Sequence, residues 1–343
     1  MIRSPVPRRI VLARRPSGVP TIDDFRIEAA GIPELGAGEF LVANRFLAID
    51  PAIRGFLDDR ESYLPPVAIG DTVRGMTLGR ILRSRDSAYA PGRFVRALAG
   101  WEDLSVLGPR ALGLEFVDPD PQTPLQFYMG ALGPSGLTAW IGLNEIGRIK
   151  GGQTVLVSAA AGAVGSVAGQ VARLQGCRVI GLAGSAAKVA HLKALGFHSA
   201  IDHHAEADLS AAIRAACPEG VDVYFDNVGG ATLELLLPLM NVHGVVVVCG
   251  MMSDYNRQDQ PQPVRTLWQL VVKRLTMRGF LTYEHADRIP AAQAELTQWI
   301  RSGELKVLDN LHAGIENAPA AFIELMSGQT VGKTLVSLVE FAV

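Results

Sequence analysis

The sequence has few cysteines and no long apolar run, and each scarcity excludes a class of protein. Only three cysteines occur in 343 residues, Cys177, Cys217 and Cys249, and none belongs to a C-x-x-C pair. They cannot form a disulfide framework or a cysteine-rich zinc lobe, so we expect Cys177 and Cys249 to be small buried residues. The longest apolar run, 245–249, has the length of a strand and falls far below the roughly 18 residues of a membrane helix.

Charge is also scarce, because charged residues make up 19% of the chain and the formal net charge is -2. This balance gives no electrostatic footprint for nucleic acid or an anionic membrane. Arg3, Arg8 and Arg9 precede only four apolar residues, too few for the core of a signal peptide. We therefore expect a cytoplasmic protein, and the length predicts two domains.

From Gln153 onward, strand and helix signals alternate with short gaps. We expect strands at 154–158, 178–183, 199–202, 221–226 and 245–249. Between them we expect a helix that ends near Leu174 and helices at 186–195, 208–216 and 231–240. Strands that are apolar on both faces and alternate with helices predict a parallel sheet covered by helices on each side.

The first 125 or so residues have short alternating segments broken by proline and glycine, which predicts an all-β domain. The expected strands are 10–13, 40–44, 79–83, 93–98 and 101–106. Residues 332–338 are again strand-like, and this strand either rejoins the β domain or stands apart.

A glycine-rich turn, Ala160–Gly165, lies between the first strand of the parallel sheet and the helix after it. This context is typical of a dinucleotide site. Gly162 lets the backbone approach the pyrophosphate, and Gly165 lets the helix pack closely on the sheet. The N-terminus of the following helix then offers free N–H groups to the phosphates. Ala160 replaces the first glycine of the full motif, and a tight turn without a ligand is the alternative.

The choice between NAD and NADP depends on the end of the second strand, where NAD enzymes carry an acidic residue. Residues 181–185 contain no acid, and Lys188 follows three positions after Ser185, the expected N-cap. The interaction of a lysine with the helix dipole at this position is unfavourable by roughly 0.3–1 kcal/mol. A bound 2′-phosphate makes the position favourable, because its charge attracts both the lysine and the helix N-terminus. NADP(H) is the expected cofactor. An ordinary solvated lysine is the alternative for Lys188.

Two more turns follow strands of the sheet, where ligands bind in open α/β folds. Residues 226–230 follow the fourth strand, and residues 249–256 follow the fifth. Asn227 either caps its turn or contacts the nicotinamide half of the cofactor.

With these motifs, the chain resembles the zinc-independent medium-chain dehydrogenase/reductases, in the branch of leukotriene B4 dehydrogenases, prostaglandin reductases, plant double-bond reductases and curcumin reductases. The matching segments span nearly the whole chain: 9–13, 50–55, 159–166, 176–185 with Lys188, 224–230, 253–256 and 332–334. The resemblance implies a GroES-like β domain formed by both chain ends, residues 1–126 and 312–343. It also implies a Rossmann domain at 127–311 and a homodimer.

The resemblance further implies NADPH-dependent reduction of the carbon–carbon double bond of α,β-unsaturated ketones or aldehydes. Cofactor contacts carry over to Gly162, Ala163, Val164, Gly165, Lys188, Asn227, Cys249, Tyr255, Phe280, Leu281 and Thr282. His203 replaces a tyrosine that lies near the 2′-phosphate in many members, and it either faces the phosphate or is a surface residue. Thr330 replaces an asparagine at the nicotinamide end. Ala52 and the segment 134–136 also differ, which affects the substrate pocket.

No Gly-His-Glu segment occurs and all seven histidines lie at or beyond His191, so a catalytic zinc site is not expected. Hydride transfer to the β-carbon leaves negative charge on the carbonyl oxygen, and hydrogen-bond donors stabilise it. By resemblance, Tyr255 and the cofactor ribose are the candidate donors. Tyr63 is either a second donor or a loop tyrosine packed on proline.

Two other functions are compatible with the same motifs. A quinone reductase shares the fold, the cofactor and the lack of zinc, although the Tyr255 segment weighs against it. A non-catalytic NADPH-binding protein is the other alternative, and Lys188 with Tyr255 weighs against that.

Overall fold

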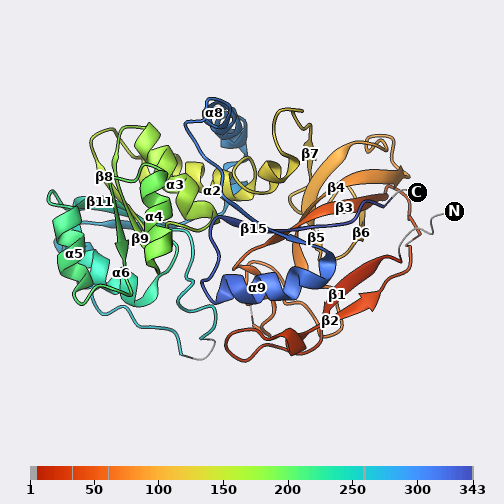
Figure 1. Cartoon of the computed structure of the whole chain (residues 1–343), viewed down its shortest axis with the longest axis horizontal. Coiled ribbons are helices and arrows are strands. Elements are labelled where there is room, and N and C mark those ends of the chain that lie inside the picture. Colours follow the sequence, from red (N-terminus) through yellow and green to blue (C-terminus); the bar gives the residue numbers. More distant parts are fainter. Residues whose placement is uncertain (1–5, 33, 61, 258–259, 342–343) are drawn as a thin grey trace. The chain divides into compact units, whose positions relative to one another are not determined.

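The computed structural model describes residues 6–32, 34–60, 62–257 and 260–341, and the chain divides into two compact units (Figure 1). One unit combines both chain ends, Met1–Met129 with Asn310–Val343, and is called here the β unit. The other is the continuous segment Gly130–Asp309, called the α/β unit. Among the helices in the described ranges, none is both long and apolar enough to cross a membrane.

The α/β unit contains a six-stranded sheet within its described residues, with the spatial order β10-β9-β8-β11-β12-β13 and every pair parallel. The strands are β8 (Thr154–Val157), β9 (Arg178–Ala183), β10 (Ser199–Asp202), β11 (Val221–Asp226), β12 (Met240–Val248) and β13 (Thr276–Gly279). This order is that of a Rossmann fold, and the predicted parallel sheet is confirmed. The order reverses between β8 and β11, and ligands bind beyond the carboxyl strand ends at such a point.

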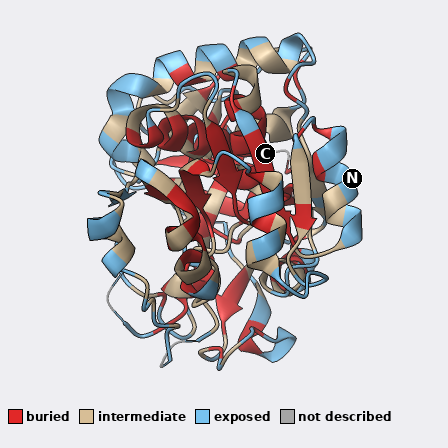
Figure 2. Cartoon of the chain, turned by 90° about the vertical axis from the view of Figure 1, so that its left-hand side faces the viewer, coloured by how far each residue is buried: buried red, intermediate tan, exposed pale blue. Residues whose placement is uncertain are grey.

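Helices cover both faces of this sheet. Those that connect its first five strands are α3 (Ala163–Leu174), α4 (Ala186–Ala194), α5 (Leu209–Ala216) and α6 (Gly230–Leu236). Right-handed crossovers place α3 and α4 on one face and α5 and α6 on the other. Accordingly, Ile213 of α5 and Leu233 of α6 share one buried cluster with Leu156 and Tyr224 of the sheet. Figure 2 shows buried strands behind helices whose outer faces are exposed.

The described residues of the α/β unit form six further helical segments. They are α2 (Pro134–Ile141), the π-helix η3 (Gly142–Gly147), the 3-10 turn η4 (Leu237–Leu239), α7 (Trp268–Val272), η5 (Thr282–Arg288) and α8 (Ile289–Arg301).

Two predicted boundaries in this unit are wrong. The helix expected to reach Met240 ends at Leu236, because Pro238 lies in the 3-10 turn that follows and cannot donate a helical hydrogen bond. Strand β12 therefore begins at Met240, five residues before the expected start. Its irregular early part, with His243 at a φ of 65°, hides the strand pattern in the sequence.

The β unit contains a large sheet whose strands β15, β3, β4, β5 and β7 pair antiparallel in that order. Strand β14 lies beyond β15, strand β6 pairs with the first part of β3, and β1 pairs with β2. Strand β15 pairs Leu335 with Ala48 of β3, so both chain ends form this unit. Strands β2, β7 and β14 were not predicted, and the expected strand at 101–106 begins only at Leu104.

The strands of the β unit are β1 (Arg8–Leu12), β2 (Phe25–Ala29), β3 (Phe40–Ile49), β4 (Arg74–Ser84), β5 (Phe94–Gly100), β6 (Leu104–Leu107), β7 (Glu115–Val117), β14 (Asp309–Ala313) and β15 (Lys333–Ser337). Its helical segments are η1 (Ile22–Asp24), α1 (Ile53–Phe56), η2 (Leu125–Met129), η6 (Ile315–Asn317) and α9 (Ala318–Met326).

Two of the motif segments have a structural role in the β unit. Lys333 is 2% exposed and forms an ion pair with Asp50 at the end of β3. Arg54 is fully buried and pairs with Asp58, while its guanidinium also donates to the carbonyl of Gly18 at 3.2 Å. A buried cation that lost its partner would be costly, so these pairs fix the chain around β3.

Candidate cofactor and substrate site

The glycine turn links β8 to α3 through a left-handed residue. Ala159 has a φ of 45°, whereas Gly162 is extended and forms the N-cap of α3. A Cβ added to Gly165 would lie 2.5 Å from the carbonyl oxygen of Ala159 and 2.8 Å from the Cα of Ala160. Only glycine therefore permits this close approach of α3 to the turn.

The N-terminus of α3 has unoccupied hydrogen-bond donors. No side chain caps the helix, and the backbone N–H groups of residues 163–165 donate to no described acceptor. Gly162, Ala163 and Val164 are partly exposed. Such a helix end attracts an anionic group, since free N–H groups and the helix dipole act together.

A second polar cluster surrounds Gly184 at the end of β9. Ser185 caps α4, as predicted, and its hydroxyl accepts from the backbone N–H of Lys188 at 3.3 Å. Lys188 is partly buried, and burial lowers the pKa of its ammonium group. A Cβ on Gly184 would lie 3.4 Å from the His203 ring and 3.2 Å from the His204 ring. The two imidazoles and Lys188 thus lie near one helix N-terminus.

Asn227 is buried, and its side chain bonds to Ser158 in the loop after β8 rather than to its own turn. Its backbone N–H donates to the Ser158 hydroxyl at 2.9 Å, and its side-chain Nδ2 donates to the Ser158 carbonyl at 2.7 Å. The residue therefore ties the end of β11 to the end of β8. Its Oδ1 accepts no hydrogen bond from the residues that the structure describes, so a ligand donor can bind there.

Cys249 and Tyr255 follow β12. Cys249 is partly buried, and burial together with the Asp226 charge raises the pKa of its thiol to about 12. The Tyr255 hydroxyl lies 3.5 Å from the backbone nitrogen of Met251, and an added Cβ on Gly250 would lie 3.3 Å from it. Burial raises the pKa of Tyr255, so its phenol stays protonated and can donate a hydrogen bond at neutral pH.

Phe280, Leu281 and Thr282 follow β13, and Phe280 lies beside the π-helix while Thr282 contacts α2. A Cβ on Gly142 would lie 2.9 Å from the Phe280 ring, and the Thr282 hydroxyl is 3.0 Å from that of Thr138. π-helical turns often occur at functional sites.

The structure places most of the predicted site residues at one edge of one sheet. After the carboxyl ends of successive strands stand Gly162–Gly165, Ser185 with Lys188, His203, Asn227, Cys249 with Tyr255, and Phe280–Thr282. Tyr63 and Thr330 belong to the β unit instead. Tyr63 is 55% exposed and its ring packs edge-on against Phe56 at 5.3 Å, while Thr330 lies between α9 and β15.

The sequence interpretation gave no role to Ser158, Tyr224 and Asp226, which form a buried polar network beside Asn227. A signal was present, because the buried run 223–226 of β11 ends in an acid, Asp226.

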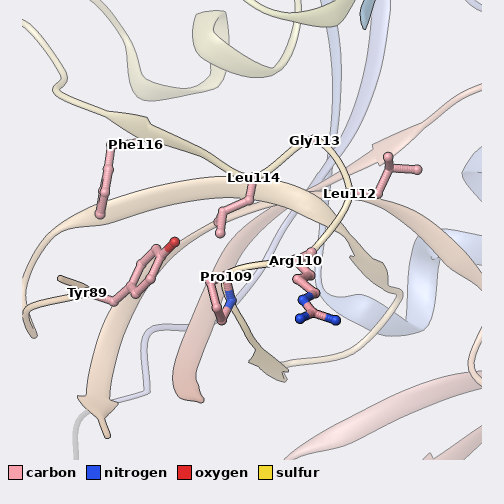
Figure 3. A pocket seen from close by; sticks show the side chains of 8 residues that line it. Tyr89, Pro109, Arg110, Leu112, Gly113, Leu114 and Phe116 are labelled. Carbon is pink, nitrogen blue, oxygen red and sulfur yellow. The ribbon is translucent and has the colours of Figure 1, made fainter. Parts of the chain in front are cut away.

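Among the described residues, no group of three His, Cys, Asp or Glu side chains is arranged to hold a metal ion. A hollow of about 380 Å³ in the β unit is lined by Tyr89, Phe116 and the loop 109–114 (Figure 3). None of the predicted site residues lines it.

Comparison with known proteins gives the family. A model described as "N-terminal domain of oxidoreductase" matches residues 8–113, and one described as "Zinc-binding dehydrogenase" matches residues 163–298. The chain is 38% identical to the NADPH-dependent curcumin reductase of Escherichia coli, over 96% of each chain. It is a medium-chain dehydrogenase/reductase.

Other members of this family are similar over the same length. The NADP-dependent 2-alkenal reductase of Nicotiana tabacum is 37% identical, again over 96% of each chain. The crystal structure of CurA from Vibrio vulnificus in complex with NADPH has a TM-score of 0.90 and 37% identity, and the match covers 97% of this chain and 99% of that one. These matches confirm the predicted Rossmann and GroES-like fold.

Proposed function

We propose that the protein uses NADPH to reduce the carbon–carbon double bond of α,β-unsaturated ketones and aldehydes. The observation that carries this proposal is the partly buried Tyr255 hydroxyl, which stays protonated and lies at the carboxyl edge of the parallel sheet. The same edge carries the glycine turn and the group of Ser185, Lys188, His203 and His204, called here the Lys188 cluster. Relatives named for the reduction of curcumin and of 2-alkenals support the proposal.

NADP(H) fits the donors along this edge. The free N–H groups of α3 suit the pyrophosphate, and the absence of a side chain at Gly162 leaves room for it. Ser185, Lys188 and His203 are assigned to the 2′-phosphate. Asn227, Cys249, residues 280–282 and Thr330 are assigned to the nicotinamide half. In this assignment residues 127–311 bind the cofactor, and residues 1–126 with 312–343 form the substrate domain.

When bound, NADPH supplies a hydride to the substrate. The chain's own task is then to stabilise the charge that develops on the substrate carbonyl oxygen. A well-placed donor such as the Tyr255 hydroxyl contributes roughly 3–4 kcal/mol to this. Tyr63 is proposed as a second donor, and solvent or a tyrosine returns a proton to the α-carbon.

The substrate class is tested by NADPH oxidation with an aliphatic enone, an aromatic enone, a 2-alkenal and a quinone. We expect turnover of the first three and a saturated carbonyl product. Turnover of the quinone alone would overturn the proposal, and so would tight NADPH binding without turnover of any acceptor.

Two substitutions test the assigned roles. Tyr255→Phe is expected to lower kcat by roughly 100-fold with intact NADPH binding. Lys188→Ala is expected to reduce the preference for NADPH over NADH by at least about tenfold. Unchanged values would remove the respective role.

We also propose that the enzyme needs no zinc and forms a homodimer. Full activity after dialysis against a chelator tests whether the enzyme works without zinc.

The proposed homodimer rests on β13, which lies at the edge of the sheet and whose four residues are all exposed. Next to it in the chain, Trp268 is 69% and Val271 59% exposed. Pairing of β13 with β13 of a second copy would cover this edge strand and the side chains of Trp268 and Val271.

We also propose a cytoplasmic location, which suits the three free thiols and the use of NADPH.

A further inference from the structure

Asp226, the last residue of β11, is fully buried, and a single carboxylate oxygen accepts four hydrogen bonds. The donors to Oδ1 are the Tyr224 hydroxyl at 2.6 Å, the Ser158 hydroxyl at 3.2 Å, and the backbone N–H groups of Val228 and Gly229, each at 2.9 Å. Tyr224 is itself fully buried, and burial raises the pKa of its phenol well above the usual range, so it remains a donor.

No cation offsets this charge among the described residues, and the second oxygen, Oδ2, accepts no hydrogen bond from them. A buried carboxylate without an ion pair is costly compared with an apolar residue of similar volume. Stabilisation of the sheet therefore does not by itself explain this network. Two of the four donors, the backbone N–H groups of Val228 and Gly229, belong to the turn that carries Asn227.

The same residue joins three loops at the carboxyl edge of the sheet. Its main-chain oxygen accepts from the N–H groups of Cys249 at 2.8 Å and Gly250 at 3.1 Å. Its side chain holds Ser158, and Ser158 in turn holds the side-chain amide of Asn227 at 2.7 Å. The loops after β8, β11 and β12 are thus fixed through one buried group.

We infer that Asp226 is a positioning residue for the nicotinamide end of the cofactor. Its carboxylate sets the turn at 226–229 and the Ser158 hydroxyl, and these orient Asn227 with its unoccupied Oδ1. The inference rests on the proposed function for the identity of the cofactor. Asp226 itself has no exposed surface and acts only through its neighbours.

Asp226→Asn tests this role, with Asp222→Asn as the matched control. Asp222 lies on the same strand, and its carboxylate accepts the backbone N–H of Thr154 at 2.8 Å and the Asn241 amide at 2.7 Å. It stands four residues before Asp226, away from the carboxyl end of β11. Both variants replace a hydrogen-bonded acid by an isosteric amide, but only Asp226→Asn alters the turn.

The readouts are the Kd of NADPH and the Kd of adenosine 2′,5′-bisphosphate, which lacks the nicotinamide half. For Asp226→Asn we expect the Kd of NADPH to rise about tenfold and kcat to fall, because a neutral oxygen holds four donors less well. We expect the Kd of the bisphosphate to stay within about twofold, since the Lys188 cluster is untouched. Asp222→Asn should leave both constants unchanged.

The inference is overturned if Asp226→Asn binds NADPH as tightly as Asp222→Asn, or if it loses both ligands equally. If Asp226→Asn does not fold, Tyr224→Phe removes one donor and should weaken NADPH binding alone, to a smaller extent; unaltered NADPH binding would then overturn it. These binding measurements do not depend on the substrate. If the protein binds NADPH but reduces no enone, the proposed function is wrong. The binding comparison of Asp226→Asn with Asp222→Asn still tests the role of Asp226 in that case.

Discussion

Ala159 carries backbone strain next to the proposed phosphate site. Its φ of 45° is in the left-handed region, which costs a residue with a Cβ roughly 1–2 kcal/mol. Such strain persists at ligand-binding turns when the surrounding structure imposes it. Here the turn is set by the hydrogen bond from the N–H of Gly162 to the Ala159 carbonyl at 3.0 Å.

We expect Ala159→Gly to raise the free energy of unfolding by about 1 kcal/mol, because glycine adopts this φ without strain. Ala161→Gly is the control, since Ala161 is buried and its φ is not positive. It should lower stability instead. Urea unfolding measures both, and equal effects would show that the strain is absent.

His203 allows a pH dependence of cofactor binding to be predicted. Burial lowers its pKa from the usual 6.5, and His204 and Lys188 add to this, while the hydrogen bond with Ala183 and the Asp202 charge act in the opposite direction. His203 is therefore neutral at neutral pH in the free protein. A bound 2′-phosphate raises its pKa, so binding takes up a proton.

The gain in NADPH affinity is complete at pH values below the lowered pKa of His203 in the free protein. It is lost as the pH rises through the raised pKa of His203 in the complex. We expect the Kd of NADPH to fall between about pH 8.5 and 6.5, a range in which the phosphate stays mostly dianionic. The Kd of NADH, which lacks that phosphate, should stay constant. His203→Gln should remove the pH dependence. A flat NADPH profile in the unaltered protein would assign His203 to the surface.

At the scale of elements, the two glycines of the turn have separable roles. Gly165 is required by the close packing of α3 on the turn, whereas a Cβ on Gly162 would meet only the Ala159 oxygen, at 3.2 Å. Gly165→Ala should therefore lower stability by about 1–3 kcal/mol. Gly162→Ala should leave the melting temperature closer to that of the unaltered chain but weaken NADPH binding. Thermal unfolding and titration with NADPH separate the two, and equal loss of stability would refute the distinction.

Element predictions succeeded where local patterns and tertiary packing agree. Helix α3 ends at Leu174 and Gly176 follows with a φ of 81°, a stop signal visible in the sequence. Strand β13 was missed because it is short, exposed and polar in part, and it forms by pairing with β12 rather than from its own pattern.

At the scale of the whole molecule, the proposed dimer predicts a mass near twice the 36.6 kDa of one chain. Val271→Glu places a charge on the exposed α7 surface and should produce monomers, since a buried charge without a partner is costly. Ile69→Glu, a substitution at another exposed apolar residue, should leave the dimer intact. Light scattering after gel filtration measures the mass, and a monomeric unaltered chain would contradict the proposal.

The sequence by itself determined the parallel sheet, the glycine turn, the missing acid at the end of β9 and the Lys188 position. These features follow from local rules of periodicity, capping and turn geometry, which act over a few residues. Only the tertiary structure decided that Ser158, Tyr224 and Asp226 meet beside Asn227, because residues from strands far apart in the chain come together only when the sheet forms. The same holds for His203 and His204, which reach Gly184 through the pairing of β10 with β9.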